Sequence, residues 1–251
     1  MNVLKQKHLR WPRVLFIFIA SQIYIPAKSQ VLISLVLGDK LNSGKVEFGL
    51  DRGLNLSDQS GLKQSDLLSS FNLGFYFDIK LKKEPWMIHT GVIVKSNMGA
   101  GNLPVYSLGQ SDLDNTFAGG SVDRKLNYFN VPILLKYNFR NHFYAEAGPQ
   151  LGLLYKAYDE FTNTVQGNEV TYRREIRDEF HRLDAGMTAG IGYRLMKGNG
   201  MNLGVRYYYG LVDVVIDNTG SPMANRSLYV VIGIPIGVGK ARERESNEKA
   251  N

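Results

Sequence analysis

The sequence contains no cysteine among its 251 residues, which excludes a disulfide framework, a thiol nucleophile and a thiolate metal site. Histidine is scarce as well, and the spacing of its four residues matches no metal-ligand pattern: His8, His89, His142 and His181. No G-x-S-x-G motif occurs, and the glycines at 99–101 and 119–120 precede no helix pattern, so a phosphate loop is not indicated. We therefore expect no catalytic residue, no cofactor and no metal ion.

Long hydrophobic runs are also absent. The longest mostly apolar stretch, residues 14–25, is too short for a membrane-spanning helix, which needs about 20 residues. A basic segment precedes it, and Pro26-Ala27-Lys28-Ser29 follows with small residues suited to cleavage before Gln30. These three parts predict a cleaved secretory signal peptide over residues 1–29.

Negative charge is missing from this leader, which explains most of the basicity of the chain. The formal net charge is +7, and five of the positive residues lie in positions 1–29, so the remainder carries about +2. A nucleic-acid partner is therefore not indicated.

What the chain has in abundance is alternation of apolar and polar residues. Between 71 and 81, Phe71, Phe75 and Phe77 lie on one face of an extended chain, and Asn72 and Asp78 on the other. The same period of two predicts eight strands, at 45–51, 71–81, 86–95, 128–139, 143–155, 183–194, 201–211 and 227–236. We expect an all-β domain over 45–238, a lead-in over 30–44 with a short helix, and a charged tail over 239–251.

The connections between these strands alternate in length. Three are short, at 82–85, 140–141 and 196–200, and four are long, at 55–70, 97–124, 156–179 and 213–225. An up-and-down transmembrane barrel has tight turns at one rim and extended loops at the other, so the pattern predicts an eight-stranded antiparallel barrel of the outer-membrane type. We expect the long connection at 156–179 to be a loop without ladder hydrogen bonds.

The two faces of the strands differ in chemistry. One is aliphatic and aromatic, which suits lipid, whereas the other carries glycine and charges of both signs, which suits the narrow interior of an eight-stranded barrel. We predict a network of paired lumen charges made of Glu47, Asp78, Lys80, Lys136, Glu146, Asp184, Arg194 and Arg206. A pore or gate is the alternative interpretation of these charges. An acid–base pair of His89 and Asp184 is an alternative to a lumen hydrogen-bond network.

Three segments resemble the PorT-like, "porin family" outer-membrane β-barrels of Bacteroidetes-type bacteria: residues 35–55 (LVLGDKLNSGKVEFGLDRGLN), 128–137 (YFNVPILLKY) and 144–154 (YAEAGPQLGLL). The resemblance implies an outer-membrane barrel with its chain ends in the periplasm. The family includes a component of the type IX secretion machinery. The charged tail, in place of a final strand aromatic, departs from the usual pattern.

The sequence thus predicts a transmembrane outer-membrane protein with a structural or partner-binding role and no enzymatic activity. A narrow channel or a component associated with type IX secretion is the alternative, and a barrel enzyme acting on lipid or peptide is a third hypothesis. Expected partners are outer-membrane lipid, lipopolysaccharide and other envelope or secretion proteins. The charged connection 156–179 offers one candidate interaction site, formed by Arg173, Arg174 and Arg177.

Overall fold

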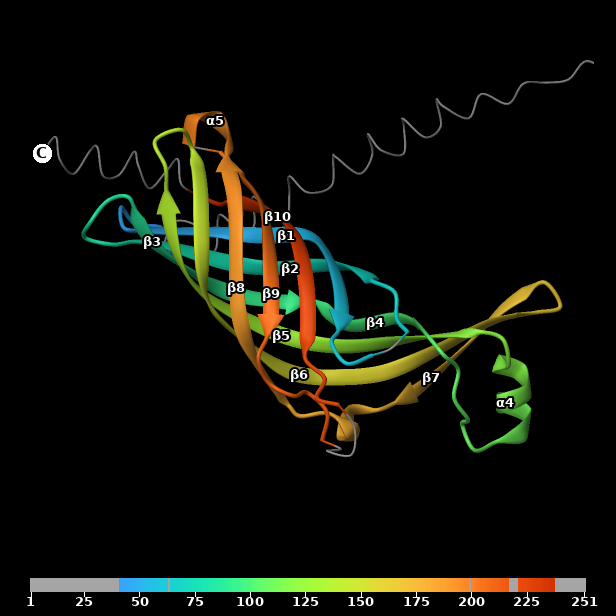
Figure 1. The fold of residues 1–251 in the computed structure, drawn as a ribbon. Helices are drawn as coiled ribbons and strands as arrows, with labels where there is room; N and C mark the ends of the chain where they lie inside the picture. Colours follow the sequence, from blue (N-terminus) through green and yellow to red (C-terminus); the bar gives the residue numbers. More distant parts are fainter. Residues whose placement is uncertain (1–40, 63, 199, 217–220, 238–251) are drawn as a thin grey trace, which may run out of the picture.

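A computed structural model describes residues 41–62, 64–198, 200–216 and 221–237 (Figure 1). The predicted signal peptide (1–29), the lead-in up to residue 40 and the tail (239–251) lie outside the described residues. None of the helices in the described ranges is long and apolar enough to cross a membrane.

Ten antiparallel strands and a few short helical segments make up the described fold. In chain order they are β1 (Val46–Gln59), β2 (Leu68–Lys80), β3 (Trp86–Lys95), β4 (Asn97–Leu103), α4 (Ser111–Phe117), β5 (Ser121–Asn138), β6 (Phe143–Val165), β7 (Asn168–Glu175), η2 (Arg177–Glu179), β8 (Leu183–Arg194), α5 (Leu195–Gly198), β9 (Asn202–Gly210) and β10 (Asn225–Pro235). All eight predicted strands are present.

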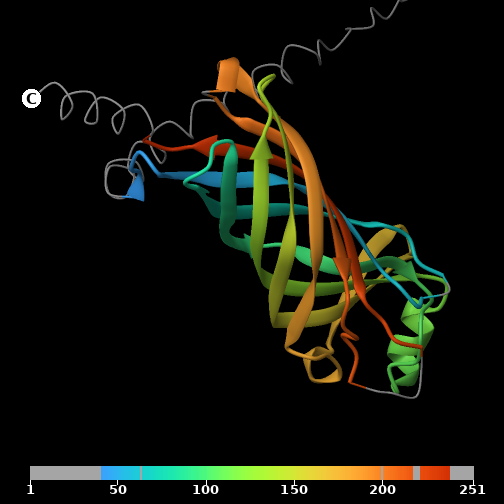
Figure 2. The same cartoon turned by 60° about the vertical axis from the view of Figure 1, so that its left-hand side comes forward.

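Eight of the strands close into a barrel. The sheet runs in the order β4-β5-β3-β2-β1-β10-β9-β8-β6-β7, and an additional pairing of β5 with β6 completes a ring that β4 and β7 do not join. The strands are long, curved and tilted relative to the barrel axis (Figure 1, Figure 2). The prediction of an eight-stranded antiparallel barrel is confirmed.

Alternation places the predicted polar face inside. On β2, the inward residues Asn72, Tyr76 and Asp78 are at most 2% exposed. The outward residues Val205 and Ile232 are 43% and 39% exposed. The structure therefore confirms the predicted faces, with an apolar exterior suited to lipid.

The two rims of the barrel differ as the connection lengths predict. At one rim, which we call the turn end, β2–β3, β5–β6 and β8–β9 are joined by short connections, and β1 begins near the end of β10. The four longer connections lie at the opposite rim, which we call the loop end. In outer-membrane barrels the short turns are periplasmic and the long loops extracellular.

At the loop end, part of the sheet continues well beyond the ring. Strand β6 runs to Val165, a two-residue turn at Gln166 and Gly167 follows, and β7 then pairs with β6 from Asn168 to Glu175. The prediction that 156–179 is a loop without ladder bonds is wrong. A β-bulge at Tyr155, where the register with β5 shifts, interrupts the alternation that would have revealed the longer strand.

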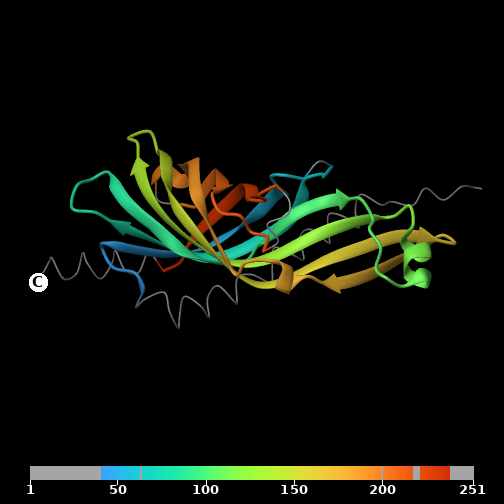
Figure 3. The same ribbon diagram turned by 60° about the horizontal axis from the view of Figure 1, so that its bottom comes forward.

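The protruding sheet, which we call the extension, consists of β4, β7, α4 and the loop-end halves of β5 and β6 (Figure 3). It has a hydrophobic core of its own, in which Phe117 of α4 packs against Phe161 of β6, with ring centroids 5.9 Å apart. Because this core is separate from the core at the barrel mouth, the extension is a packed unit with its own hydrophobic core and not a set of loose loops.

Candidate functional site

The turn-end half of the lumen is filled by a group of charged side chains. We call it the lumen cluster, and its members are Asp51, Asp78, His89, Lys136, Glu146 and Arg206, all at most 7% exposed. They come from β1, β2, β3, β5, β6 and β9, so the cluster joins six of the eight barrel strands. Strand closure brings them together, since each lies on the inward face of its own strand.

Asp78 is the acceptor at one side of the lumen cluster. Nζ of Lys136 donates to its Oδ2 at 2.8 Å, and Nδ1 of His89 lies 2.7 Å from its Oδ1. Lys136 also lies over the ring of Tyr144, 4.2 Å from the centroid. Each carboxylate oxygen thus has a donor, which offsets the cost of burying its charge.

Arg206 is the donor at the other side. Its Nε donates to Oε1 of Glu146, its Nη1 donates to Oδ2 of Asp51 at 3.0 Å, and its Nη2 lies 2.9 Å from Nε2 of His89. The positions of these atoms suit a His89 ring whose Nδ1 donates to Asp78 and whose Nε2 accepts from Arg206. One arginine therefore links three side chains across the lumen.

A separate ion pair lies nearer the turn end. Nη2 of Arg194 on β8 donates to Oε2 of Glu47 on β1, and the hydroxyl of Tyr76 lies 3.3 Å from Oε1 of the same carboxylate. The Tyr76 ring stacks on His89 with centroids 5.4 Å apart, so it connects this pair to the lumen cluster.

Seven of the eight predicted lumen residues therefore fall into three groups. Asp78, Lys136, Glu146 and Arg206 lie in the lumen cluster, and Glu47 pairs with Arg194. Asp184 lies apart from these ion pairs, and its Oδ2 accepts a hydrogen bond from Nδ2 of Asn225 at 2.8 Å.

Lys80 does not belong to the network, contrary to the prediction. It is the last residue of β2, where the chain reaches the rim and its side chain is exposed to solvent. No carboxylate of the described ranges lies within ion-pair distance of it.

Sequence reasoning missed the roles of two residues in this site. The predicted network does not contain Asp51, and the sequence suggests Asp184 as the partner of His89. The register places His89 directly opposite Asp78 instead. Only the pairing of β2 with β3 reveals this contact.

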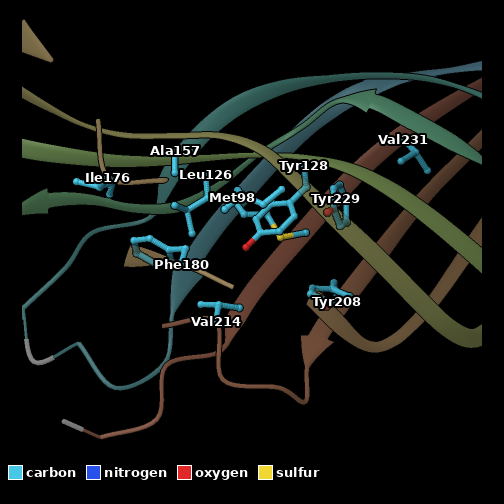
Figure 4. Close-up of a cluster of buried hydrophobic side chains, with 11 residues drawn as sticks. Met98, Leu126, Tyr128, Ala157, Ile176, Phe180, Tyr208, Val214, Tyr229 and Val231 are labelled. Carbon is cyan, nitrogen blue, oxygen red and sulfur yellow. The ribbon is translucent and has the colours of Figure 1, made fainter. Parts of the chain in front are cut away.

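The loop-end half of the lumen is closed by a different kind of packing. A hydrophobic group, which we call the mouth cluster, consists of Met98, Leu126, Tyr128, Leu154, Ala157, Ile176, Phe180, Tyr208, Val214, Tyr229 and Val231 (Figure 4). Most of these are inward residues of the strands, whereas Phe180 and Val214 come from the connections above them. Apolar side chains therefore seal the lumen above the lumen cluster.

The predicted interaction residues lie on the extension. Nε of Arg173 donates to Oε2 of Glu160 at 2.6 Å, and the Arg174 guanidinium donates to the Tyr106 hydroxyl at 2.9 Å and to Oε1 of Glu179 at 2.8 Å. Arg177 is partly buried in η2. Arg173 and Arg174 are thus paired with carboxylates, whereas Nε of Arg177 has no hydrogen-bond partner among the described residues.

The base of the extension holds a pocket of about 470 Å³ lined by Leu62, Gln64, Leu103, Pro104, Tyr106 and Arg124. At its polar side, Arg124 makes two hydrogen bonds to Asp159, at 2.9 and 2.8 Å, and the Tyr106 hydroxyl donates to the same carboxylate at 2.8 Å. Burial raises the pKa of Tyr106 to about 12. The hydroxyl is therefore a donor at neutral pH.

The barrel, its lipid-compatible surface and its filled lumen define an outer-membrane β-barrel protein. A family model described as "Outer membrane protein beta-barrel domain" matches residues 37–215, and the chain belongs to this family. No curated protein matches the chain.

Solved structures with a similar fold include several bacterial surface proteins. Ail, the attachment invasion locus protein of Yersinia pestis, has a TM-score of 0.40 at 12% identity, covering 76% of this chain and 99% of its own. Neisserial surface protein A has 0.38 at 14%, covering 76% and 96%, and OprG of Pseudomonas aeruginosa has 0.37 at 13%, covering 77% and 98%.

Proposed function

We propose that this protein is a closed outer-membrane barrel that displays its extension as a binding platform for an extended segment of a partner protein. The observation that carries the proposal is the free edge of β7. Strand β7 stands last in the sheet order and pairs only with β6, so its outer edge has no partner strand among the described residues.

The register identifies which backbone groups face outward. Ile176 donates its N–H to the carbonyl of Ala157 at 3.1 Å, so alternate residues from Asn168 to Arg174 face β6. The N–H and C=O groups of Glu169, Thr171, Arg173 and Glu175 therefore point away from the sheet. An extended peptide can add to such an edge through main-chain hydrogen bonds.

A filled lumen supports a displaying role over a conducting one. The lumen cluster blocks the turn-end half and the mouth cluster blocks the loop-end half. The alternative of a narrow channel needs both to rearrange. Association with a secretion machine, one of the alternatives considered from the sequence, would be one instance of partner binding at the same edge.

The first test is conductance in a planar bilayer. We expect the purified protein to show no steady conductance. A Tyr128→Ala, Tyr208→Ala, Tyr229→Ala variant, which opens only the mouth cluster, should also stay closed, because the lumen cluster still blocks the turn-end half. Steady conductance of the unmodified protein would favour the channel alternative.

The second test addresses the edge. Thr171→Pro removes an outward N–H without removing a bond to β6, and Thr171→Val keeps that N–H with a side chain of similar shape. Displayed peptide libraries should yield the same extended sequences with the wild type and Thr171→Val, and none with Thr171→Pro. If all three proteins selected the same peptides, the edge of β7 would be rejected as the binding site. If the extension bound purified lipopolysaccharide and no peptide, the ligand would be lipopolysaccharide and not a partner protein.

A further inference from the structure

The barrel interior contains one carboxylate that differs from all the others. Asp51, Asp78 and Glu146 each have a cationic partner in the lumen cluster. Asp184 is only 1% exposed, yet no lysine or arginine of the described ranges lies within ion-pair distance of it. An isolated buried carboxylate is costly unless it is neutralised.

The hydrogen bonds of Asp184 leave half of the carboxylate unsatisfied. Its Oδ2 accepts from Asn225, whereas its Oδ1 has no hydrogen-bond partner of normal geometry among the described residues. The free oxygen faces the interior, since Asp184 lies on the inward face of β8.

Neutral oxygen atoms lie in the same region of the lumen as this carboxylate. Asn130, 1% exposed, has no hydrogen-bond partner for either side-chain amide atom among the described residues. The Tyr208 hydroxyl lies beside the Asp184 carboxylate and the Tyr128 hydroxyl beside the Asn225 amide, but neither contact has normal hydrogen-bond geometry. Four buried oxygen atoms without a hydrogen bond of normal geometry thus belong to one region of the lumen.

Gly152 on β6 shows how these groups converge. It lies between Asn130 and Asp184 in the register of the sheet, and it carries no side chain. A Cβ at this position would lie 2.9 Å from Oδ1 of Asn130, 3.1 Å from the Tyr128 ring and 3.3 Å from Cβ of Asp184. The Asn130 oxygen therefore leans over the glycine, toward the strand that carries Asp184.

We propose that Asp184, Asn130, Tyr128 and Tyr208 form a binding site for a monovalent hard cation of the sodium type. Oxygen ligands suit hard cations, and one unit of positive charge neutralises the single carboxylate. A divalent cation is disfavoured, because the described residues contain no cluster of three or more Asp, Glu, His or Cys side chains suited to it.

The test compares unfolding temperatures of the detergent-folded barrel in sodium chloride and in N-methylglucamine chloride at equal ionic strength, scored by heat-modifiable gel migration. Because a ligand of the folded state alone stabilises it, we expect sodium to raise the wild-type unfolding temperature by at least about 4 °C. Asp184→Asn keeps the shape and an acceptor for Asn225 but removes the charge. We expect this variant to fold, and its unfolding temperature to be the same in both salts.

Asp114→Asn, at an exposed carboxylate of the extension, is the matched control and should retain the sodium dependence. Line broadening in sodium NMR should be present for the wild type, reversed by excess potassium, and absent for Asp184→Asn. Equal wild-type unfolding temperatures in the two salts, together with an infrared carboxylic-acid band that Asp184→Asn removes, would overturn the proposal. That result would mean that a proton neutralises Asp184. Sodium dependence that persists in Asp184→Asn would equally reject this site.

Discussion

Arginine–carboxylate pairs occur in two regions of this molecule, and their surroundings differ sharply. In the lumen cluster the side chains of Arg206 and Glu146 are 5% and 0% exposed, whereas on the extension Arg173 is 61% exposed. Removing one partner of a buried ion pair greatly lowers the free energy of unfolding, because the remaining charge is left buried without a partner or water. Removing one partner of an exposed pair changes the free energy of unfolding very little. Arginine–carboxylate pairs therefore stabilise the barrel interior strongly, whereas on the extension they can be substituted with little loss of stability.

The largest difference should come from removing the central arginine. Arg206→Met leaves Glu146 and Asp51 buried without their cation, and we expect a loss of about 3–5 kcal/mol in the free energy of unfolding. Arg173→Met on the extension should cost at most about 1 kcal/mol. Urea unfolding in detergent, followed by Trp86 fluorescence, measures both. Similar losses for the two variants would show that the lumen is hydrated enough to screen its charges.

A charge on the lipid face tests the outer surface of the same strand. Val205→Arg should cost about 2–4 kcal/mol if the residue lies near the bilayer midplane. The matched control is Thr171→Arg, which adds the same charge to the exposed face of β7 and should leave folding into lipid vesicles unchanged. If Thr171→Arg were the more damaging of the two, the assignment of faces would be wrong.

Crowding of the lumen predicts a smaller effect. A Cβ at Gly204 would lie 2.5 Å from the Tyr144 hydroxyl, so Gly204→Ala should overpack the interior and cost about 1–3 kcal/mol. Adding Tyr144→Phe removes the clashing oxygen and should recover part of the loss in the same urea titration. Ala189→Val, on the exposed face of β8, serves as the control for added volume. No recovery in the double variant would mean that the strain lies in the backbone. Gly190, which pairs with the inward residue Arg206, is crowded as well: an added Cβ would lie 2.7 Å from the Val205 carbonyl oxygen and 2.8 Å from Cγ of Arg206.

The barrel could be predicted from the sequence because the two patterns that indicate it, alternation within each strand and the lengths of the connections, can be read directly along the chain. Period-two alternation marks each strand, and the alternating connection lengths order the strands around the ring. The lumen cluster was predictable in part, since inward charges follow from alternation. The partner of each charge was not, because the contact of Asp78 with His89 depends on the pairing of β2 with β3.

The extension was missed for a physical reason. The Tyr155 bulge shifts the alternation of β6 by one residue, and β7 carries the charges typical of an exposed edge strand. A usable signal was nevertheless present: Val170 and Tyr172 alternate after the turn dipeptide Gln166-Gly167.

A weaker effect than any in the barrel should follow from changing Arg174. It lies in β7 opposite Asp159, so Arg174→Ala removes contacts to Tyr106 and Glu179 and should loosen the β6–β7 hairpin by at most about 1 kcal/mol. Limited proteolysis of the folded protein should cut the hairpin faster while heat-modifiable migration stays unchanged. Loss of the folded band would show that the barrel depends on the extension.

The smallest expected effect concerns the ionisation of the Tyr106 hydroxyl on the extension. Burial raises the pKa of Tyr106 from its ordinary value of 10.0 to about 12, and Asp159 acts in the same direction, whereas the hydrogen bond from Arg174 lowers it. Because the folded pKa is the higher one, the contribution of Tyr106 to the stability of the extension is complete below pH about 10. It is lost as the pH rises from there through about 12.

Ultraviolet difference absorbance between the wild type and Tyr106→Phe should isolate this titration. Asp159→Asn should shift it to lower pH, and Arg174→Ala should shift it to higher pH if the ring stays buried. A Tyr106 that ionised near its ordinary pKa would mean that the pocket is open to water and that the extension is not packed against the loop that carries this residue. In that case the binding edge of β7 would lack the rigid support on which the proposed function rests, while the predictions for the lumen would stand unchanged.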